Sequence, residues 1–243
     1  MDAILLAAIG VAAGAALQSA TGFGFALVAA PLVFAAGEPA EAVGLMTLLP
    51  VVVNGLILLG ERRRPRPLGR ECAVLTAAAA PGTVAGIVVL RALDAVTLQI
   101  AVSVGVVATL LARRAAQDRH APAWAGPLAG FASGALNTST TTSGPPLLLY
   151  LTGRGIEPGR LRDTVIVVFL GLSALSAVAL WATATTEAVP AARDVLLLVP
   201  LAVAGQLTGR PLFRRLAHGG GYERVLTAML LVSVAVGLAT AIA

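Results

Sequence analysis

Long apolar runs separated by short polar connections make up most of this 243-residue chain. Each run has close to the roughly 20 residues with which a helix crosses a bilayer. The runs are continuously apolar rather than alternating, which excludes a transmembrane β-barrel. They predict an all-α polytopic membrane protein. The predicted spans are Ala42–Gly60, Cys72–Leu90, Ala95–Ala112, Thr164–Thr186, Val225–Ala243 and the shorter Val195–Gly209.

Two further apolar stretches, Ile4–Ala36 and Trp124–Leu151, are interrupted near the middle by glycine and small polar residues. Each is too long for one simple span and too short for two full ones. Membrane transporters build binding sites from helices that are broken in this way. We expect each stretch to form a broken helix or a re-entrant hairpin.

The two halves of the chain repeat each other. Gly10-x3-Gly14-x3-Gln18 in the first interrupted stretch corresponds to Gly126-x3-Gly130-x3-Gly134 in the second, and Pro81-Gly82-x3-Gly86 corresponds to Pro200-x4-Gly205-x3-Gly209. Small residues four positions apart let membrane helices pack closely. The pattern predicts two repeats, residues 1–115 and 121–243, joined by a cytoplasmic linker over residues 116–120. Each repeat starts with an interrupted element followed by three transmembrane helices.

Arginine placement predicts the topology. The chain has no lysine, and most of its 17 basic residues lie in four connections, which the positive-inside rule places in the cytoplasm. The connection after the first interrupted stretch is acidic, with Glu38 and Glu41, so the two repeats are expected to have inverted topology in the cytoplasmic (inner) membrane. The four basic connections are Glu61–Glu71, Arg113–His120, Gly153–Asp163 and Arg210–His218.

Composition supports the membrane assignment and narrows the function. Hydrophobic residues make up 58% of the chain, charged residues 12%, and the mean hydropathy is +0.90, which a soluble fold of this length does not accommodate. The single cysteine, Cys72, excludes an intramolecular disulfide and suggests no metal cluster. His120 and His218 lie in connections without catalytic partners, and no connection carries a phosphate-binding signature. We expect neither an enzyme, nor a cofactor, nor a nucleic-acid partner.

The second interruption is the strongest candidate for a binding site. A half-helix that begins inside the membrane presents free N–H groups and a partial positive charge, which suit an oxyanion, and proline fits its first turn. A hydroxyl-rich turn that satisfies its own carbonyl groups is the alternative. The candidate substrate-binding residues here are Asn137, Thr138, Ser139, Thr140, Thr141, Thr142, Ser143, Gly144 and Pro145.

The first interruption offers a second set of donors and flexible backbone. Its phenylalanines could close the site or could simply pack against other helices. A few polar residues inside the predicted spans could support the site as a second shell or could bond to neighbouring helices. The candidates in the first stretch are Gln18, Ser19, Thr21, Gly22, Phe23 and Gly24, and the second-shell candidates are Asn54, Ser173, together with the nearby Ser176, and Gln206.

These motifs resemble the TauE/SafE sulfite exporter family over nearly the whole chain. The family has a Gln-x2-Thr-Gly-Phe-Gly-Phe core followed by proline, which matches Gln18 to Phe25 and Pro31, and a Ser-Gly-Pro-Pro segment, which matches Ser143 to Pro146. The hydroxyl-rich run before Ser143 departs from the glycine-rich stretch usual in the family. The resemblance implies a transporter that moves sulfite or a small organosulfur oxyanion across the cytoplasmic membrane.

Two mechanisms fit the sequence. A secondary transporter working by alternating access agrees with the inverted repeats. A passive anion channel would use the same pore-lining residues. The expected partners are a small anionic solute and the lipid bilayer, and the GxxxG motifs permit a homodimer.

The topology can be tested with a reporter fused after Ala243. Because the arginine pattern places the last span from inside to outside, the reporter should be found outside the cytoplasm. A reporter that is active only in the cytoplasm would contradict the inverted arrangement.

Overall fold

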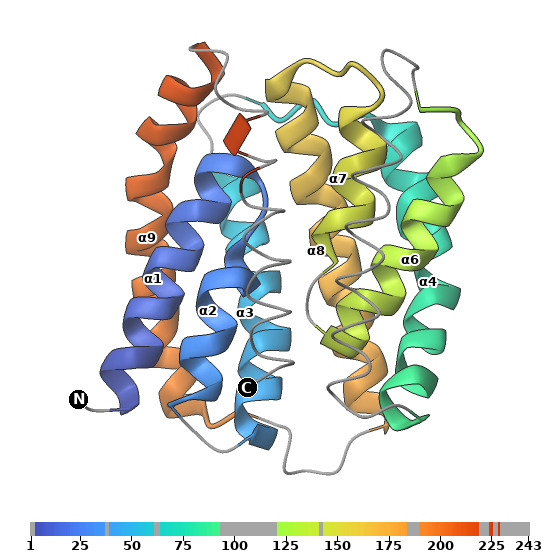
Figure 1. Cartoon of the computed structure of the whole chain (residues 1–243). Coiled ribbons are helices and arrows are strands. Elements are labelled where there is room, and N and C mark those ends of the chain that lie inside the picture. The colour runs from blue at the N-terminus through green and yellow to red at the C-terminus, as the bar shows by residue number, and fades with distance from the viewer. Residues whose placement is uncertain are drawn as a thin grey trace.

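The computed structural model describes residues 3–36, 39–60, 64–92, 121–140, 143–183, 190–218, 224–225 and 228. Regular secondary structure in this part of the chain is entirely helical (Figure 1). The helices are α1 (Ala3–Thr21), α2 (Phe25–Phe34), α3 (Pro39–Gly60), α4 (Gly69–Ala92), α6 (Ala125–Thr140), α7 (Gly144–Thr152), α8 (Pro158–Thr183) and α9 (Ala192–His218).

Most of the described helices follow the apolar runs. Four of them, α1, α4, α8 and α9, are long and apolar enough to cross a membrane. The predicted span Ala95–Ala112 lies outside the described residues, and so does nearly all of Val225–Ala243. The regular structure of the described residues is therefore helical and is consistent with the polytopic membrane protein that the apolar runs predict.

Two helices extend further than predicted. α9 runs for 27 residues, so it is longer than Val195–Gly209 and includes the expected connection Arg210–His218. α8 begins at Pro158, inside the expected connection Gly153–Asp163. Charged residues end an apolar run without ending a helix, because arginine has a high helix propensity.

Both interrupted stretches form pairs of helices. α1 packs against α2 with a break over residues 22–24, and α6 packs against α7 with a break that ends at Ser143. In Figure 1 the first pair begins and ends near the lower end of the molecule, whereas the second begins and ends near the upper end. Each pair is a helical hairpin, and the two hairpins point in opposite directions in the view.

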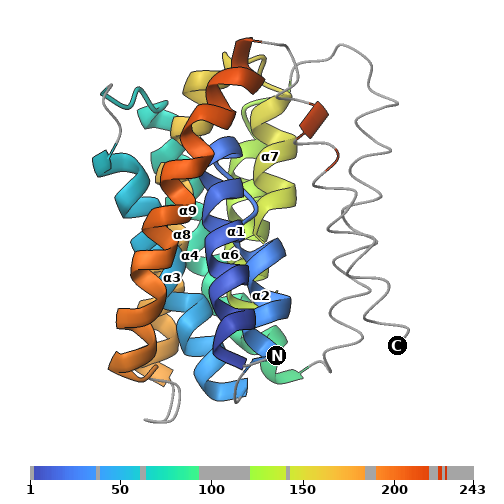
Figure 2. The same cartoon turned by 90° about the vertical axis from the view of Figure 1, so that its left-hand side faces the viewer.

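Glycines bring helices from different halves of the chain into close contact. A Cβ atom on Gly205 of α9 would overlap the carbonyl oxygen of Ala12 on α1, and one on Gly82 of α4 would overlap the carbonyl of Phe131 on α6. The predicted small-residue motifs therefore pack α1 against α9 and α4 against α6 (Figures 1 and 2). Each hairpin is held by a helix from the other half.

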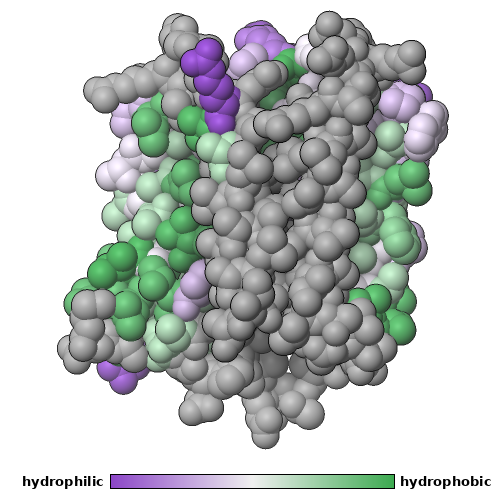
Figure 3. Space-filling model, viewed as in Figure 1, coloured by the Kyte–Doolittle hydropathy of each residue, from purple (hydrophilic) through white to green (hydrophobic). Residues whose placement is uncertain are grey.

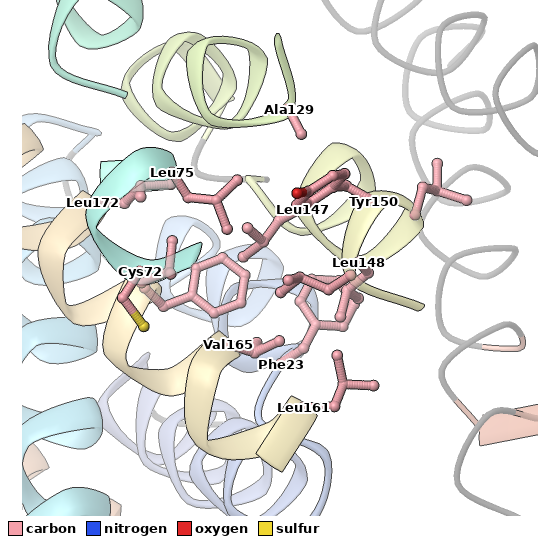
Figure 4. Close-up of a cluster of buried hydrophobic side chains, with 14 of the residues drawn as sticks. Phe23, Cys72, Leu75, Ala129, Leu147, Leu148, Tyr150, Leu161, Val165 and Leu172 are labelled. Atoms are coloured by element: carbon pink, nitrogen blue, oxygen red, sulfur yellow. The ribbon is translucent and has the colours of Figure 1, made fainter. Parts of the chain in front are cut away.

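Two clusters of buried side chains form the core. One, in Figure 4, joins α4, α6, α7 and α8, and Phe23 enters it from the first hairpin. The other surrounds α1, α2 and α3 and receives Ile166 from α8. α3 and α8 pack against each other between the hairpins. This arrangement places residues 22–24 of the first break and Ser143 of the second in the interior of the bundle.

The described surface is apolar at mid-height. On the face in Figure 3, apolar residues lie at mid-height on the left and right sides, and most strongly hydrophilic residues lie toward the top and bottom. Large apolar side chains such as Val88, Leu128 and Leu196 are exposed on α4, α6 and α9. Exposed apolar surface of this extent suits contact with lipid rather than water.

Replacing Gly205 with alanine tests the packing of α1 on α9. The added methyl group would overlap the Ala12 carbonyl, so the helices must separate, and we expect a loss of about 1–3 kcal/mol in the free energy of unfolding. Gly55→Ala is the matched control, because no atom lies within 4 Å of its added Cβ and alanine is the better helix former. Equal unfolding temperatures for the two variants in detergent would contradict the close contact.

Candidate functional site

Two glycines with positive φ make the break in the first hairpin. Gly22 has φ 81° and Gly24 has φ 102°, a region that residues with a side chain rarely adopt. The hydroxyl of Thr21 accepts the N–H of Phe23 at 3.2 Å, and it can donate its one proton to the carbonyl of Phe23 at 2.6 Å or to that of Leu17 at 2.8 Å. The hydroxyl thus satisfies the peptide groups at the turn.

A glutamine side chain caps the helix that follows this break. The Oε1 atom of Gln18 accepts the backbone N–H of Phe25, the first residue of α2, at 2.9 Å. The Nε2 atom of the same side chain donates to Oδ1 of Asn54 on α3 at 2.6 Å. One buried amide therefore connects α1, α2 and α3.

An asparagine has a related position in the second hairpin. The Nδ2 atom of Asn137 donates to the hydroxyl of Ser176 at 2.7 Å and to the carbonyl of Leu172 at 3.3 Å. Its Oδ1 atom accepts the hydroxyl of Ser143 at 2.9 Å. Asn137 therefore ties the end of α6 to α8 and to the start of α7.

Phe23 connects the two hairpins. Its ring lies against Gly144, where an added Cβ would overlap the ring, and it stacks on Phe169 of α8 with 6.0 Å between the ring centroids. Only glycine leaves room for the ring at position 144. The first break therefore packs directly against the first residue of α7.

A cavity of about 50 Å³ lies between the hairpins and the central helices α3 and α8. A cavity needs about 10–15 Å³ by this measure to hold one water molecule, so the space fits a solute of a few heavy atoms. Its walls come from both hairpins, from α3 and from α8. The lining residues are Gln18, Phe23, Gly24, Phe25, Ala26, Leu27, Met46, Thr47, Pro50, Asn54, Asn137, Ser143, Gly144, Phe169, Ser173 and Ser176.

The N-terminal ends of two helices border this cavity. The first turn of α2 contributes Phe25, Ala26 and Leu27, and α7 contributes Gly144 next to Ser143. A helix start carries a partial positive charge and N–H groups without intrahelical acceptors. Because Pro145 and Pro146 lack an N–H, the first turn of α2 offers more backbone donors than that of α7. No charged side chain of the described residues lines the cavity.

The structure gathers about half of the predicted site residues around this cavity. From the two interruptions, the cavity is lined by Gln18, Phe23, Gly24, Asn137, Ser143 and Gly144, and from the spans it is lined by Asn54, Ser173 and Ser176. The cavity lining does not include Ser19, Thr21, Gly22, Thr138, Ser139, Pro145 or Gln206. Thr141, Thr142 and the side chain of Thr140 lie outside the described residues.

Several hydroxyls outside the lining bond to backbone carbonyls. Ser139 donates to the carbonyl of Ala135 in its own helix at 2.8 Å, and Thr138 donates to that of Gly134 at 3.1 Å. Ser19 donates to the carbonyl of Gln206, whose own side chain donates to Leu56. Ser139 and Thr138 therefore bond to carbonyls of their own helix, the arrangement expected of a hydroxyl-rich turn, and Thr138 also contacts Ser176.

Other lining residues were not expected from the sequence. Met46, Pro50 and Asn54 recur every four positions on α3 and so share one helix face, with Thr47 beside them. Phe169 and Ser173 share a face of α8 in the same way. Helical spacing around the polar residues Asn54 and Ser173 was the signal that would have identified these neighbours.

One polar group beside the cavity has no partner among the described residues. Asn54 is fully buried, its Oδ1 atom accepts from Gln18, and its Nδ2 atom has no hydrogen-bond acceptor in the part of the chain that the structure describes. An unsatisfied buried donor typically costs about 1–3 kcal/mol. Asn54 is one of the lining residues, so this unsatisfied donor belongs to the wall of the cavity, although the Nδ2 atom itself is buried.

A buried arginine supports the tip of the first hairpin. The sequence places Arg162 in a connection, yet it is fully buried, and its Nε and Nη2 atoms donate to the carbonyl of Ser19 at 2.9 and 2.7 Å. The correction has a physical reason, because the C-terminal end of α1 has free carbonyls and a partial negative charge that favour a cation. The neighbouring Asp163 is buried too and accepts the backbone N–H of Arg66 at 2.7 Å.

The far end of α7 is held by a second polar group of side chains. The hydroxyl of Tyr150 donates to Glu71 of α4 at 2.7 Å, and Arg154 forms an ion pair with the same carboxylate at 3.4 Å. These contacts fix the end of α7 that lies away from the cavity.

The family model of the sulfite exporter TauE/SafE matches residues 6–238. The chain belongs to this family. No curated protein and no solved structure matches it. Membership in the TauE/SafE family implies a membrane transporter of sulfur anions, and it confirms the resemblance inferred from the Gln18 to Phe25 and Ser143 to Pro146 motifs. In this TauE/SafE protein both motifs contribute residues to the cavity.

Arg162→Met tests the support of the hairpin tip. The substitution removes two hydrogen bonds to the Ser19 carbonyl and leaves Asp163 buried without its neighbouring cation, so we expect a loss of about 3 kcal/mol or more in the free energy of unfolding. Arg160→Met is the control, since Arg160 is exposed on the same helix. Thermal unfolding in detergent measures both, and equal stability would show that the buried guanidinium does not hold α1.

Proposed function

We propose that this protein is a secondary transporter that carries sulfite or a small organosulfur oxyanion across the cytoplasmic membrane by alternating access. The observation that carries the proposal is the cavity between the two hairpins, which helix N-termini border and both family motifs help to line. Family membership supplies the class of solute. The cavity supplies a place for it.

The chemistry of the lining suits an oxyanion. The starts of α2 and α7 provide partial positive charge, and Asn54 provides a side-chain donor. A site without a formal cation binds an anion without holding it so tightly that release becomes slow. This balance is what a carrier requires.

The arrangement of helices supports alternating access. The hairpins begin at opposite ends of the molecule in Figure 1, and each packs on a helix of the other half, α1 on α9 and α6 on α4. We interpret residues 1–115 and 121–243 as inverted repeats that rock about the contact between α3 and α8. Such a motion would open the cavity to each side of the membrane in turn.

Sulfite counterflow in proteoliposomes tests this function. We expect saturable, exchangeable uptake of sulfite by the wild-type protein. Ser143→Ala should raise the half-saturating concentration roughly tenfold, because it removes a hydroxyl that lines the cavity and donates to Asn137 in the same wall. Thr152→Val is the control at the other end of α7, where the hydroxyl donates to the carbonyl of Leu148.

Three results would contradict parts of the proposal. Uptake that rises linearly with concentration and shows no counterflow would indicate a passive channel. Equal effects of the two substitutions would remove Ser143 from the site. An absence of sulfite, sulfate and thiosulfate flux would refute transport of sulfur oxyanions.

A further inference from the structure

The orientation of two amide groups beside the cavity, those of Gln18 and Asn54, follows from one backbone donor. The N–H of Phe25 can only donate, so the Gln18 atom that it meets at 2.9 Å must be the oxygen Oε1. The amide nitrogen of Gln18 therefore faces Asn54, at 2.6 Å. Two amide nitrogens cannot form a hydrogen bond, so Asn54 turns Oδ1 toward Gln18 and is left with Nδ2.

The amide nitrogen of Asn54 differs in its hydrogen bonding from the amide nitrogens of the other lining residues. The nitrogen of Gln18 donates to Asn54, and the nitrogen of Asn137 donates to Ser176 and Leu172. Among the described lining residues, Asn54 is the amide whose nitrogen has no acceptor, although the residue is fully buried. The N–H at the start of α2 sets the orientation of Gln18, and Gln18 sets that of Asn54. Asn54 therefore contributes a donor rather than an acceptor to the cavity wall that α3 forms.

We infer that Asn54 binds the transported anion directly by donating from Nδ2 to one of its oxygens, and that Gln18 is the positioning residue that sets this polarity. The inference rests on the proposed function and goes beyond it by assigning the residue that selects an oxygen acceptor. A cation would meet the positive side of the amide and is disfavoured. The preferred ligand is an oxyanion that presents an unprotonated oxygen to α3.

Asn54→Asp is the most direct test, because aspartate has nearly the same shape. One carboxylate oxygen still accepts from Gln18. The other takes the place of the Nδ2 donor and brings a negative charge. We expect the apparent Kd for sulfite to rise roughly 10- to 100-fold. The measurement is the sulfite-dependent rise in unfolding temperature of the purified full-length protein over a concentration series.

Gln18→Glu tests the positioning role without changing Asn54. The glutamate can still accept the N–H of Phe25 with one oxygen, but its other oxygen now needs a donor from Asn54. Asn54 then turns Nδ2 toward residue 18 and presents Oδ1 to the cavity. We expect a loss of sulfite affinity similar to that of Asn54→Asp, although the hydrogen bond between the two residues is kept. Because the added negative charge also repels an anion, the same substitution in an Asn54→Ala background separates the two effects. A loss that acts through Asn54 disappears in that background, whereas a loss from charge repulsion remains.

Ser133→Ala is the matched control, since Ser133 on α6 also has a buried polar atom without a partner but does not line the cavity. Its sulfite affinity should equal that of the wild type.

Unchanged affinity in both Asn54→Asp and Gln18→Glu would overturn the inference while the proposed function stands. Weaker binding in Asn54→Asp alone would overturn the role of Gln18. A wild-type protein that sulfite, sulfate and thiosulfate all fail to stabilise would overturn the proposed function and this inference together.

Discussion

An interrupted helix inside a bilayer must satisfy the peptide groups that the interruption frees, because no water is available at that depth. In the first hairpin Thr21 and Gln18 accept the N–H groups of Phe23 and Phe25. In the second hairpin Ser143 gives its hydroxyl to Asn137 rather than capping α7. The breaks therefore stay in the interior only while buried polar side chains from neighbouring helices surround them. The cavity and its donors are a consequence of this constraint.

The glycine contacts give this polar centre a rigid frame. α1 approaches α9, and α6 approaches α4, closely enough that a Cβ atom at the contact would overlap backbone. Arg162 adds a third constraint, because it holds the C-terminal end of α1 from α8. The hairpins are thus fixed along their long helices, whereas the starts of the short helices α2 and α7 border the cavity. A carrier needs this combination of rigid bodies and a polar site between them.

Much of this arrangement was predictable from local pattern. The apolar runs predicted the described helices, and the glycine and polar interruptions located both breaks. The sequence could not separate Ser143 from Ser139, because both belong to one hydroxyl run and only the helical phase of α6 turns Ser139 back onto Ala135. Nor could it assign Arg162, whose acceptor on Ser19 is 143 positions away in the chain. Apolar lining residues such as Met46 and Phe169 have the same local pattern as core residues.

The most direct test of the central claim is a crystal structure of the protein with selenite, an analogue of sulfite whose selenium has a strong anomalous signal, in the absence of added thiols. The account predicts one anomalous peak in the cavity between the starts of α2 and α7, with an oxygen within hydrogen-bond distance of Asn54. A peak elsewhere, such as among the arginines at the ends of the helices, with none in the cavity would contradict it.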